Sequence, residues 1–161
     1  MSFTTKKSDF LKKLKEKGKL KLVEPSEEVK QAYLKKSASY LDSAKLLLKN
    51  KKFEEAISMA YYSMYYFLLA LLFRVGIKSE NHTASIFLLK ELFGLDNSEM
   101  LKAKKERIDK QYYVDFKIVE SDVKDLIKVV ENFNGKIFDF LEKMSLSEIE
   151  RIREKFIEII S

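Results

Sequence analysis

The sequence predicts an all-α fold: an antiparallel helical bundle of about five core helices, with a basic N-terminal arm and an additional C-terminal helix. Chain breakers are few, because the 161 residues include only four glycines and one proline, and folds rich in sheet or loops use more of both. Apolar side chains recur at helical spacing along most of the chain, and no segment has the alternation of a strand. The apolar content of 46% can fill one core, and a chain of this length forms a single domain.

The N-terminal segment, residues 1–24, carries most of the net positive charge. It holds eight lysines against three acidic residues, whereas the whole chain has a net charge of +6. Phe10 and Leu14 fall on one side of a helical wheel, so the segment is either a short amphipathic helix or a partly disordered arm. Its lysines either contact nucleic-acid phosphates or form a solvated face. Pro25 separates this arm from the bundle, which we place at residues 25–161.

Six helices are expected after the arm, each supported by its periodicity and by residues that start or stop helices. Ser26, followed by two glutamates, begins the first of them, and Gly94 ends the third. Ser145 and Glu148 match a capping box that begins the last helix, an addition to the bundle at residues 143–161. The expected ranges are 27–50, 53–74, 83–93, 98–112, 123–141 and 146–160, with a loop at 77–82.

The second helix, residues 53–74, is apolar on every side. Between Ala56 and Phe73, only Ser58 and Ser63 are not apolar, so neighbouring elements must enclose the helix all round. A membrane span needs about 20 apolar residues, and this run is shorter and contains four tyrosines. The pattern therefore predicts the central helix of a bundle, or a helix shared with a second subunit, and no membrane contact.

The composition excludes several classes of site. The chain has no cysteine and one histidine, which rules out disulfides, thiolate metal sites, a cysteine nucleophile and a zinc site built on several histidines. A Ser-His-Asp triad would have to use His82. We expect no catalytic residues, metal or cofactor. The first residues lack the apolar block of a signal peptide, so we expect a cytoplasmic protein.

Four tyrosines in the second helix give the strongest functional signal. Helical spacing places Tyr62 over Tyr66, and Tyr61 over Tyr65. A buried phenol needs a hydrogen-bond partner for its hydroxyl. The group is therefore either ordinary core packing with a few satisfied hydroxyls, or a face that forms a pocket or an interface.

Three further side chains are candidates for binding an anion. His82 follows Lys78 at the start of the third helix, where both could hold an anion beside free backbone N–H groups; alternatively, His82 only caps the helix. Arg107 could bind a phosphate with two parallel hydrogen bonds. It could equally form an ion pair within its own helix or lie in solvent.

These segments, taken in order, resemble the HEPN family (higher eukaryote and prokaryote nucleotide-binding domain). Residues 53–65, Phe-Glu-Glu-Ala-Ile-Ser-Met-Ala-Tyr-Tyr-Ser-Met-Tyr, are similar to an acidic-Ala-x-x-x-Ala-Tyr-Tyr-x-Met pattern in the family's central helix. Residues 76–78 and 81–83 resemble the loop of Lys-Thr-His-Ser type that follows. The spacing from Arg107 to Tyr112 is similar to the family's Arg-x-x-Ala-Asp-Tyr.

The resemblance, which extends over residues 29–142, implies an all-α bundle of four or five helices that is commonly a homodimer. Members often act beside a small nucleotidyltransferase in toxin–antitoxin or stress modules. Many are metal-independent RNases whose motif is Arg, a polar residue and, after four to six intervening residues, His. Here Ile108 follows Arg107 and Tyr112 stands where the His would be, so the resemblance implies a branch without that motif.

We therefore predict a non-catalytic HEPN-like binding module. It would act as a homodimer and bind a nucleotide or RNA, a nucleotidyltransferase partner, or both. The predicted ligand-binding residues are Tyr61, Tyr62, Tyr65, Lys78, His82, Arg107 and Tyr112. One alternative is a metal-independent RNase toxin that uses Arg107 and His82. The other is a structural assembly protein whose central helix is covered by a second subunit.

Overall fold

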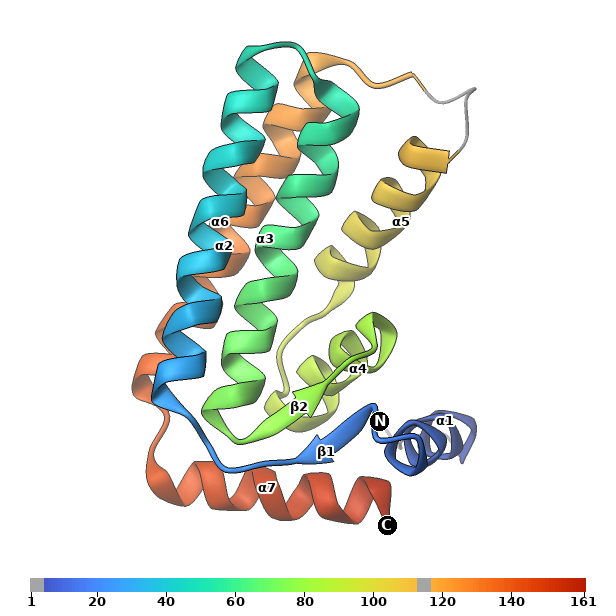
Figure 1. Ribbon diagram of the computed structural model, residues 1–161, viewed down its shortest axis with the longest axis vertical. Coiled ribbons are helices and arrows are strands. Elements are labelled where there is room, and N and C mark those ends of the chain that lie inside the picture. The colour runs from blue at the N-terminus through green and yellow to red at the C-terminus, as the bar shows by residue number, and fades with distance from the viewer. Residues whose placement is uncertain (1–4, 113–116) are drawn as a thin grey trace.

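The computed structural model describes residues 5–112 and 117–161, and of residues 109–112 it describes the backbone. The described residues form seven helices and one two-stranded sheet (Figure 1), which confirms the all-α class. The helices are α1 (Thr5–Glu16), α2 (Glu27–Lys49), α3 (Phe53–Arg74), α4 (His82–Phe93), α5 (Ser98–Tyr112), α6 (Glu120–Lys143) and α7 (Leu146–Ile160), and the strands are β1 (Leu20–Leu22) and β2 (Ile77–Ser79).

Helix α3 is the centre of the bundle. It packs against α2, α4, α5 and α6, and α2, α3 and α6 run lengthwise beside one another (Figure 1). Although α3 is long and apolar enough to cross a membrane, 67% of its most apolar window is buried inside the bundle. Burial of most of the helix is the reason for its apolar sequence, while Tyr62 and Tyr66 on one side of it stay half-buried.

A small polar group joins the three long helices inside the core. The Ser37 hydroxyl of α2 donates to the Ser63 carbonyl of α3 over 2.6 Å, and the Ser63 hydroxyl donates to the Ser37 carbonyl over 2.9 Å. From α6, the Asn134 side-chain amide donates to the Ser63 hydroxyl over 3.1 Å. Small side chains let α2 and α3 approach closely, and the paired hydrogen bonds fix the register of α2 against α3.

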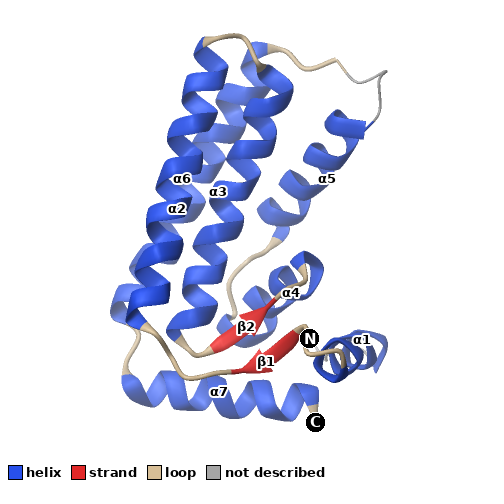
Figure 2. Cartoon of the chain, viewed as in Figure 1, coloured by secondary structure: helices blue, strands red, loops and turns tan. Residues whose placement is uncertain are grey.

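A short sheet closes one end of the bundle, which corrects the prediction that the chain has no strand and a loop at 77–82. Strands β1 and β2 pair in antiparallel fashion, with Leu20 opposite Ser79 and Leu22 opposite Ile77 (Figure 2). Each strand is three residues long. That length is too short to produce a recognisable alternation in the sequence, so tertiary packing decides the conformation.

Residues 5–24 of the N-terminal segment are an ordered part of the fold. Of the two possibilities left open by the sequence, the structure has the amphipathic helix, α1. Its Leu11 and Leu14 are buried, as is Leu20 of β1. Helix α1 packs against α7, where the Ser8 hydroxyl donates to the Ile159 carbonyl over 3.4 Å.

Hydrogen bonds from one arginine connect helix α7 to the same end of the bundle. Arg153 Nη1 donates to the carbonyl oxygens of Val23 and Val75, each over 2.8 Å, and to that of Gly76 over 3.3 Å. Gly76 has a φ of 74°, in the left-handed region. The turn after α3 thus presents its carbonyls to α7 in a conformation that favours glycine.

Candidate functional site

The candidate site lies where α3, the first turn of α4 and the middle of α5 meet. Tyr61 and Tyr65 are buried on α3, one turn apart, and Tyr62 beside them is half-buried. The Asn81 side chain caps α4 by accepting from the Ala84 N–H over 2.9 Å, as is usual for an Asn at this position. This cap sets His82 as the first residue of α4, facing the tyrosines of α3.

The imidazole of His82 is held by two tyrosines. The Tyr65 ring stacks on it, with ring centroids 3.7 Å apart and planes 11° from parallel. The Tyr61 hydroxyl lies 2.8 Å from His82 Nδ1. The two groups share one hydrogen bond: the phenol donates to Nδ1 when the ring proton is on Nε2, and accepts from Nδ1–H in the other tautomer. The stacking and this hydrogen bond together fix the orientation of the ring.

Arg107 and Lys104 bring two positive charges to this imidazole from one turn of α5. The Arg107 guanidinium lies 5.1 Å from the centre of the Tyr61 ring and 5.4 Å from that of Tyr62, and its Nη1 donates to the Tyr62 hydroxyl over 3.4 Å. The Lys104 ammonium donates to the Thr83 hydroxyl over 2.6 Å. Both cations thus lie beside aromatic or hydroxyl groups.

Burial and charge set the protonation states of the site. Burial, followed by the charges of Arg107 and Lys104, lowers the pKa of His82 to about 4, so the imidazole is neutral at pH 7. Burial raises the pKa of Tyr65 to about 12 and that of Tyr61 higher still, so both phenols keep their protons. Burial, and then Arg107, lower the pKa of Lys104. A negatively charged ligand would relieve the repulsion between these groups.

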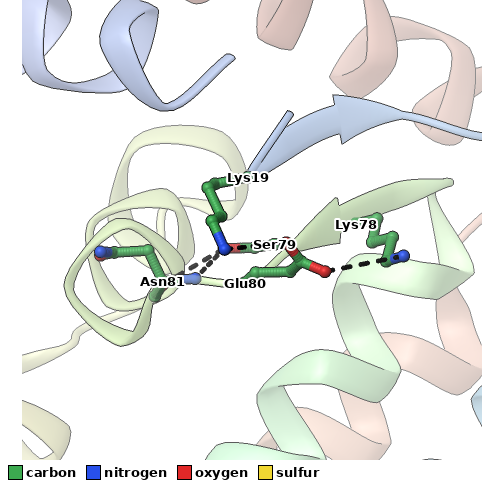
Figure 3. A network of polar contacts seen from close by, with 5 residues as sticks. All are labelled: Lys19, Lys78, Ser79, Glu80 and Asn81. Atoms are coloured by element: carbon green, nitrogen blue, oxygen red, sulfur yellow. Dashed lines mark hydrogen bonds and ion pairs between the residues drawn. The ribbon is translucent and has the colours of Figure 1, made fainter. Parts of the chain in front are cut away.

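The structure brings together Tyr61, Tyr62, Tyr65, His82 and Arg107 from the predicted set, and we call these residues, with Lys104, the tyrosine–histidine cluster. It places Lys78 elsewhere. Lys78 is on β2, where its ammonium pairs with Glu80 over 3.8 Å; Lys19 pairs with the same carboxylate over 3.8 Å (Figure 3). The side chain of Tyr112 lies outside the described residues.

Lys104 and Thr83 belong to the site but were not predicted from the sequence. A usable signal was present for Lys104, because it lies three residues before Arg107 and therefore on the same face of a helix. Thr83 follows His82 directly, and its role depends on the packing of α5 against α4, which the sequence does not reveal.

A second group of rings continues outward from the cluster. We call Tyr33 and Tyr40 of α2, with Tyr62 and Tyr66 of α3, the tyrosine face. The Tyr66 ring stacks with Tyr33 at 5.9 Å and with Tyr40 at 5.1 Å, and the Lys36 ammonium lies 4.5 Å from its centre. All four rings are half-buried. Tyr62 belongs to both groups, so the buried cluster is continuous with a surface.

A separate pocket between α5 and α6, of about 390 Å³, has an acidic lining that includes Glu99, Glu106, Asp122 and Asp125. Among the described residues, no three His, Asp or Glu side chains are grouped so that they could hold a metal ion.

Comparison with known proteins identifies the family. A HEPN domain model matches residues 30–143, which is more than half of the chain. This chain belongs to the HEPN family. The match of this HEPN protein extends from α2 to α6 and includes every residue of the tyrosine–histidine cluster, whereas α1, β1 and α7 lie outside it. The HEPN protein is also 28% identical over 125 residues to a UPF0332 protein of Thermotoga maritima, and the alignment covers 73% of this chain and 95% of that protein.

Proposed function

We propose that this HEPN protein is a non-catalytic binding module that holds a nucleotide, or the end of an RNA strand, at the tyrosine–histidine cluster. The observation that carries the proposal is the position of two cations at the cluster: Arg107 lies against the rings of Tyr61 and Tyr62, and Lys104 donates a hydrogen bond to Thr83 beside His82. Two cations one helical turn apart neutralise a phosphate group, and Arg can bind it with two hydrogen bonds. Half-buried tyrosine rings stack on bases without requiring a particular sequence.

Binding is favoured over catalysis by the state of His82. Proton transfer near neutral pH is most efficient when the pKa of the group lies near the working pH. The pKa of His82 is about 4, and its Nδ1 is engaged by Tyr61 at 2.8 Å. The imidazole is therefore a weak base and is already deprotonated when an acid is needed. In the tautomer that carries the ring proton on Nε2, the imidazole can donate a hydrogen bond to a bound phosphate oxygen.

The tyrosine face supports the homodimer as part of this proposal. Four half-buried rings lie together on α2 and α3, and interfaces between proteins are enriched in tyrosine. A second copy on this face would place two clusters close together in one cleft. A nucleotidyltransferase in a cytoplasmic toxin–antitoxin or stress system is the protein partner that the family relationship suggests.

Calorimetric titration tests the proposed ligand. AMP, ATP and a short RNA are expected to release heat on binding, and adenosine, which lacks the phosphate, is expected to bind at least tenfold more weakly. Light scattering at micromolar concentration should give twice the mass of the 18.9 kDa chain. No heat with any of the three phosphate ligands, combined with no association with a co-expressed nucleotidyltransferase, would remove the proposal.

A metal-independent RNase is the second candidate, and one observation favours it. Arg107 and His82 are on different helices, yet both contact Tyr61, which is the juxtaposition an RNA-cleaving pair would need. Incubation of labelled RNA with the protein in a chelator would decide. Cleavage that is lost in both Arg107→Ala and His82→Ala would favour the RNase, whereas cleavage that survives both changes would identify a contaminant.

A further inference from the structure

An aromatic pocket with a basic rim lies between α1 and α4. Its volume is about 390 Å³, and Lys6, Lys7, Phe10, Thr83 and Phe87 line it. The rings of Phe10 and Phe87 meet edge to face, with centroids 6.3 Å apart. The Lys7 ammonium lies 4.8 Å from the centre of the Phe87 ring. The pocket therefore offers apolar ring surface for a flat group and positive charge for an anion attached to it.

This pocket is joined to the tyrosine–histidine cluster through a single residue. Thr83 lines the pocket, and its hydroxyl accepts the hydrogen bond from Lys104 over 2.6 Å. Thr83 also follows His82 directly on the first turn of α4. Positive side chains and rings thus alternate from the pocket to the cluster. The order is Lys7, Phe87, Lys104, His82 and Arg107.

The charge of α1 complements a polyanion. Residues 5–16 contain five lysines against two acidic residues. Figure 1 shows α1 and α4 at the same end of the molecule, with α5 above α4. Surfaces that bind single-stranded nucleic acid combine a basic track for the backbone with aromatic rings for the bases. Acidic peptides would use the lysines but would leave the Phe10–Phe87 surface without a flat partner.

We propose that the α1–α4 pocket is a second subsite for single-stranded RNA, which receives a base against Phe10 and Phe87 while the neighbouring phosphates contact Lys6 and Lys7. This inference rests on the proposed function, in which the tyrosine–histidine cluster holds one nucleotide. Since Thr83 of the pocket contacts Lys104 of the cluster, one strand of two or more nucleotides can occupy both sites. An RNA strand therefore binds more tightly than a mononucleotide, because the second contact is intramolecular.

Fluorescence anisotropy with a labelled RNA octamer of adenosine, and competition by AMP, separates the two sites in the full chain. Phe87→Leu is expected to weaken octamer binding by about five- to twentyfold through the loss of stacking, and to leave AMP binding unchanged. Phe138→Leu on α6 is the matched control, because Phe138 is an exposed ring outside the pocket. A thermal melt of each variant confirms that it folds.

The lysines give a second readout that does not depend on the aromatic core. Replacing Lys6 and Lys7 by Gln should reduce the slope of log affinity against log salt by about 1.4, the value for two contacts to single-stranded phosphates. Replacing Lys128 and Lys136, which are exposed on α6, should leave the slope unchanged.

The possible outcomes distinguish this inference from the proposed function. Two results would overturn the second subsite alone, provided that AMP binds normally. In the first, the octamer binds no more tightly than AMP; in the second, the Phe87→Leu variant binds the octamer as the wild type does. Failure of both AMP and the octamer to bind overturns both proposals. Tighter binding of a DNA octamer, or equal competition by an oligoglutamate, would assign the pocket to another anion and also overturn the inference.

Discussion

Replacement of Arg107 by alanine is expected to lower the affinity for AMP or a short RNA by about 10- to 100-fold. Charge-assisted hydrogen bonds contribute about 1.5–3 kcal/mol each when their geometry is good, and Arg107 is the cation best placed to form a bidentate pair with a phosphate. Its guanidinium already lies beside the rings of Tyr61 and Tyr62. Calorimetry with AMP measures the change directly.

Two further variants show whether the loss comes from the geometry of Arg107 or from charge alone. Arg107→Lys keeps the charge but not the planar fork, so its affinity should lie between those of the wild type and Arg107→Ala. Arg151→Ala removes an exposed arginine of α7 and should change affinity by less than about twofold, as expected for a remote surface charge. Equal affinities of Arg107→Ala and Arg151→Ala would contradict the proposed site.

Replacement of Gly76 by alanine is expected to destabilise the fold by about 3 kcal/mol or more. The residue has a φ of 74°, where a side chain costs about 1–2 kcal/mol. A Cβ at this position would also overlap with Arg153 Nη1 and with the Val23 carbonyl oxygen. The overlap would displace Arg153 from the carbonyls that fasten α7, β1 and the end of α3 together.

Gly94 provides a matched control for this substitution. It has a φ of 66°, nearly that of Gly76, but an added Cβ would meet no atom within 4 Å. Gly94→Ala should therefore lower the free energy of unfolding by only about 1 kcal/mol, the cost of placing a side chain in the left-handed conformation. Urea denaturation, monitored by circular dichroism, gives the free energy of unfolding of each variant. Equal losses in the two variants would mean that the contacts of Arg153 around Gly76 do not stabilise the end of the bundle.

Most of the helices could be predicted from a periodic apolar pattern, and α3 from its nearly uninterrupted apolar run; several also have local end signals. Ser26 and Ser145 cap α2 and α7 as their sequences indicate, and Gly94 ends α4 in the left-handed conformation. The strands could not be predicted, because three residues show no periodicity and β1 forms only when β2 is beside it. Their conformation depends on a pairing between residues more than 50 positions apart.

The site was predicted in part, and the reason differs between residues. The tyrosines and His82 face one another because α3 and α4 are packed as consecutive helices. Lys78 was expected beside His82 because it is close in sequence. Neighbouring residues of a strand point to opposite faces, however, so Ser79 lies in the buried interior while Lys78 pairs with Glu80. The role of Thr83 depends on the packing of α5 against α4, which a helical pattern does not specify.

The most direct test of the account is the pKa of His82, measured by NMR with and without AMP. His82 is the single histidine of the chain, so its imidazole signals need no assignment by mutation. Without ligand, burial and the charges of Arg107 and Lys104 should hold the pKa at about 4. A phosphate beside these groups favours the charged imidazole, so saturating AMP should raise the pKa. Binding would then take up a proton, and affinity for AMP would increase as the pH falls from the pKa of the complex toward 4. A ligand-free pKa of about 4 that rises by one unit or more with AMP is the predicted result, whereas a pKa that stays the same at saturating AMP would contradict the proposal that phosphate binds at this cluster.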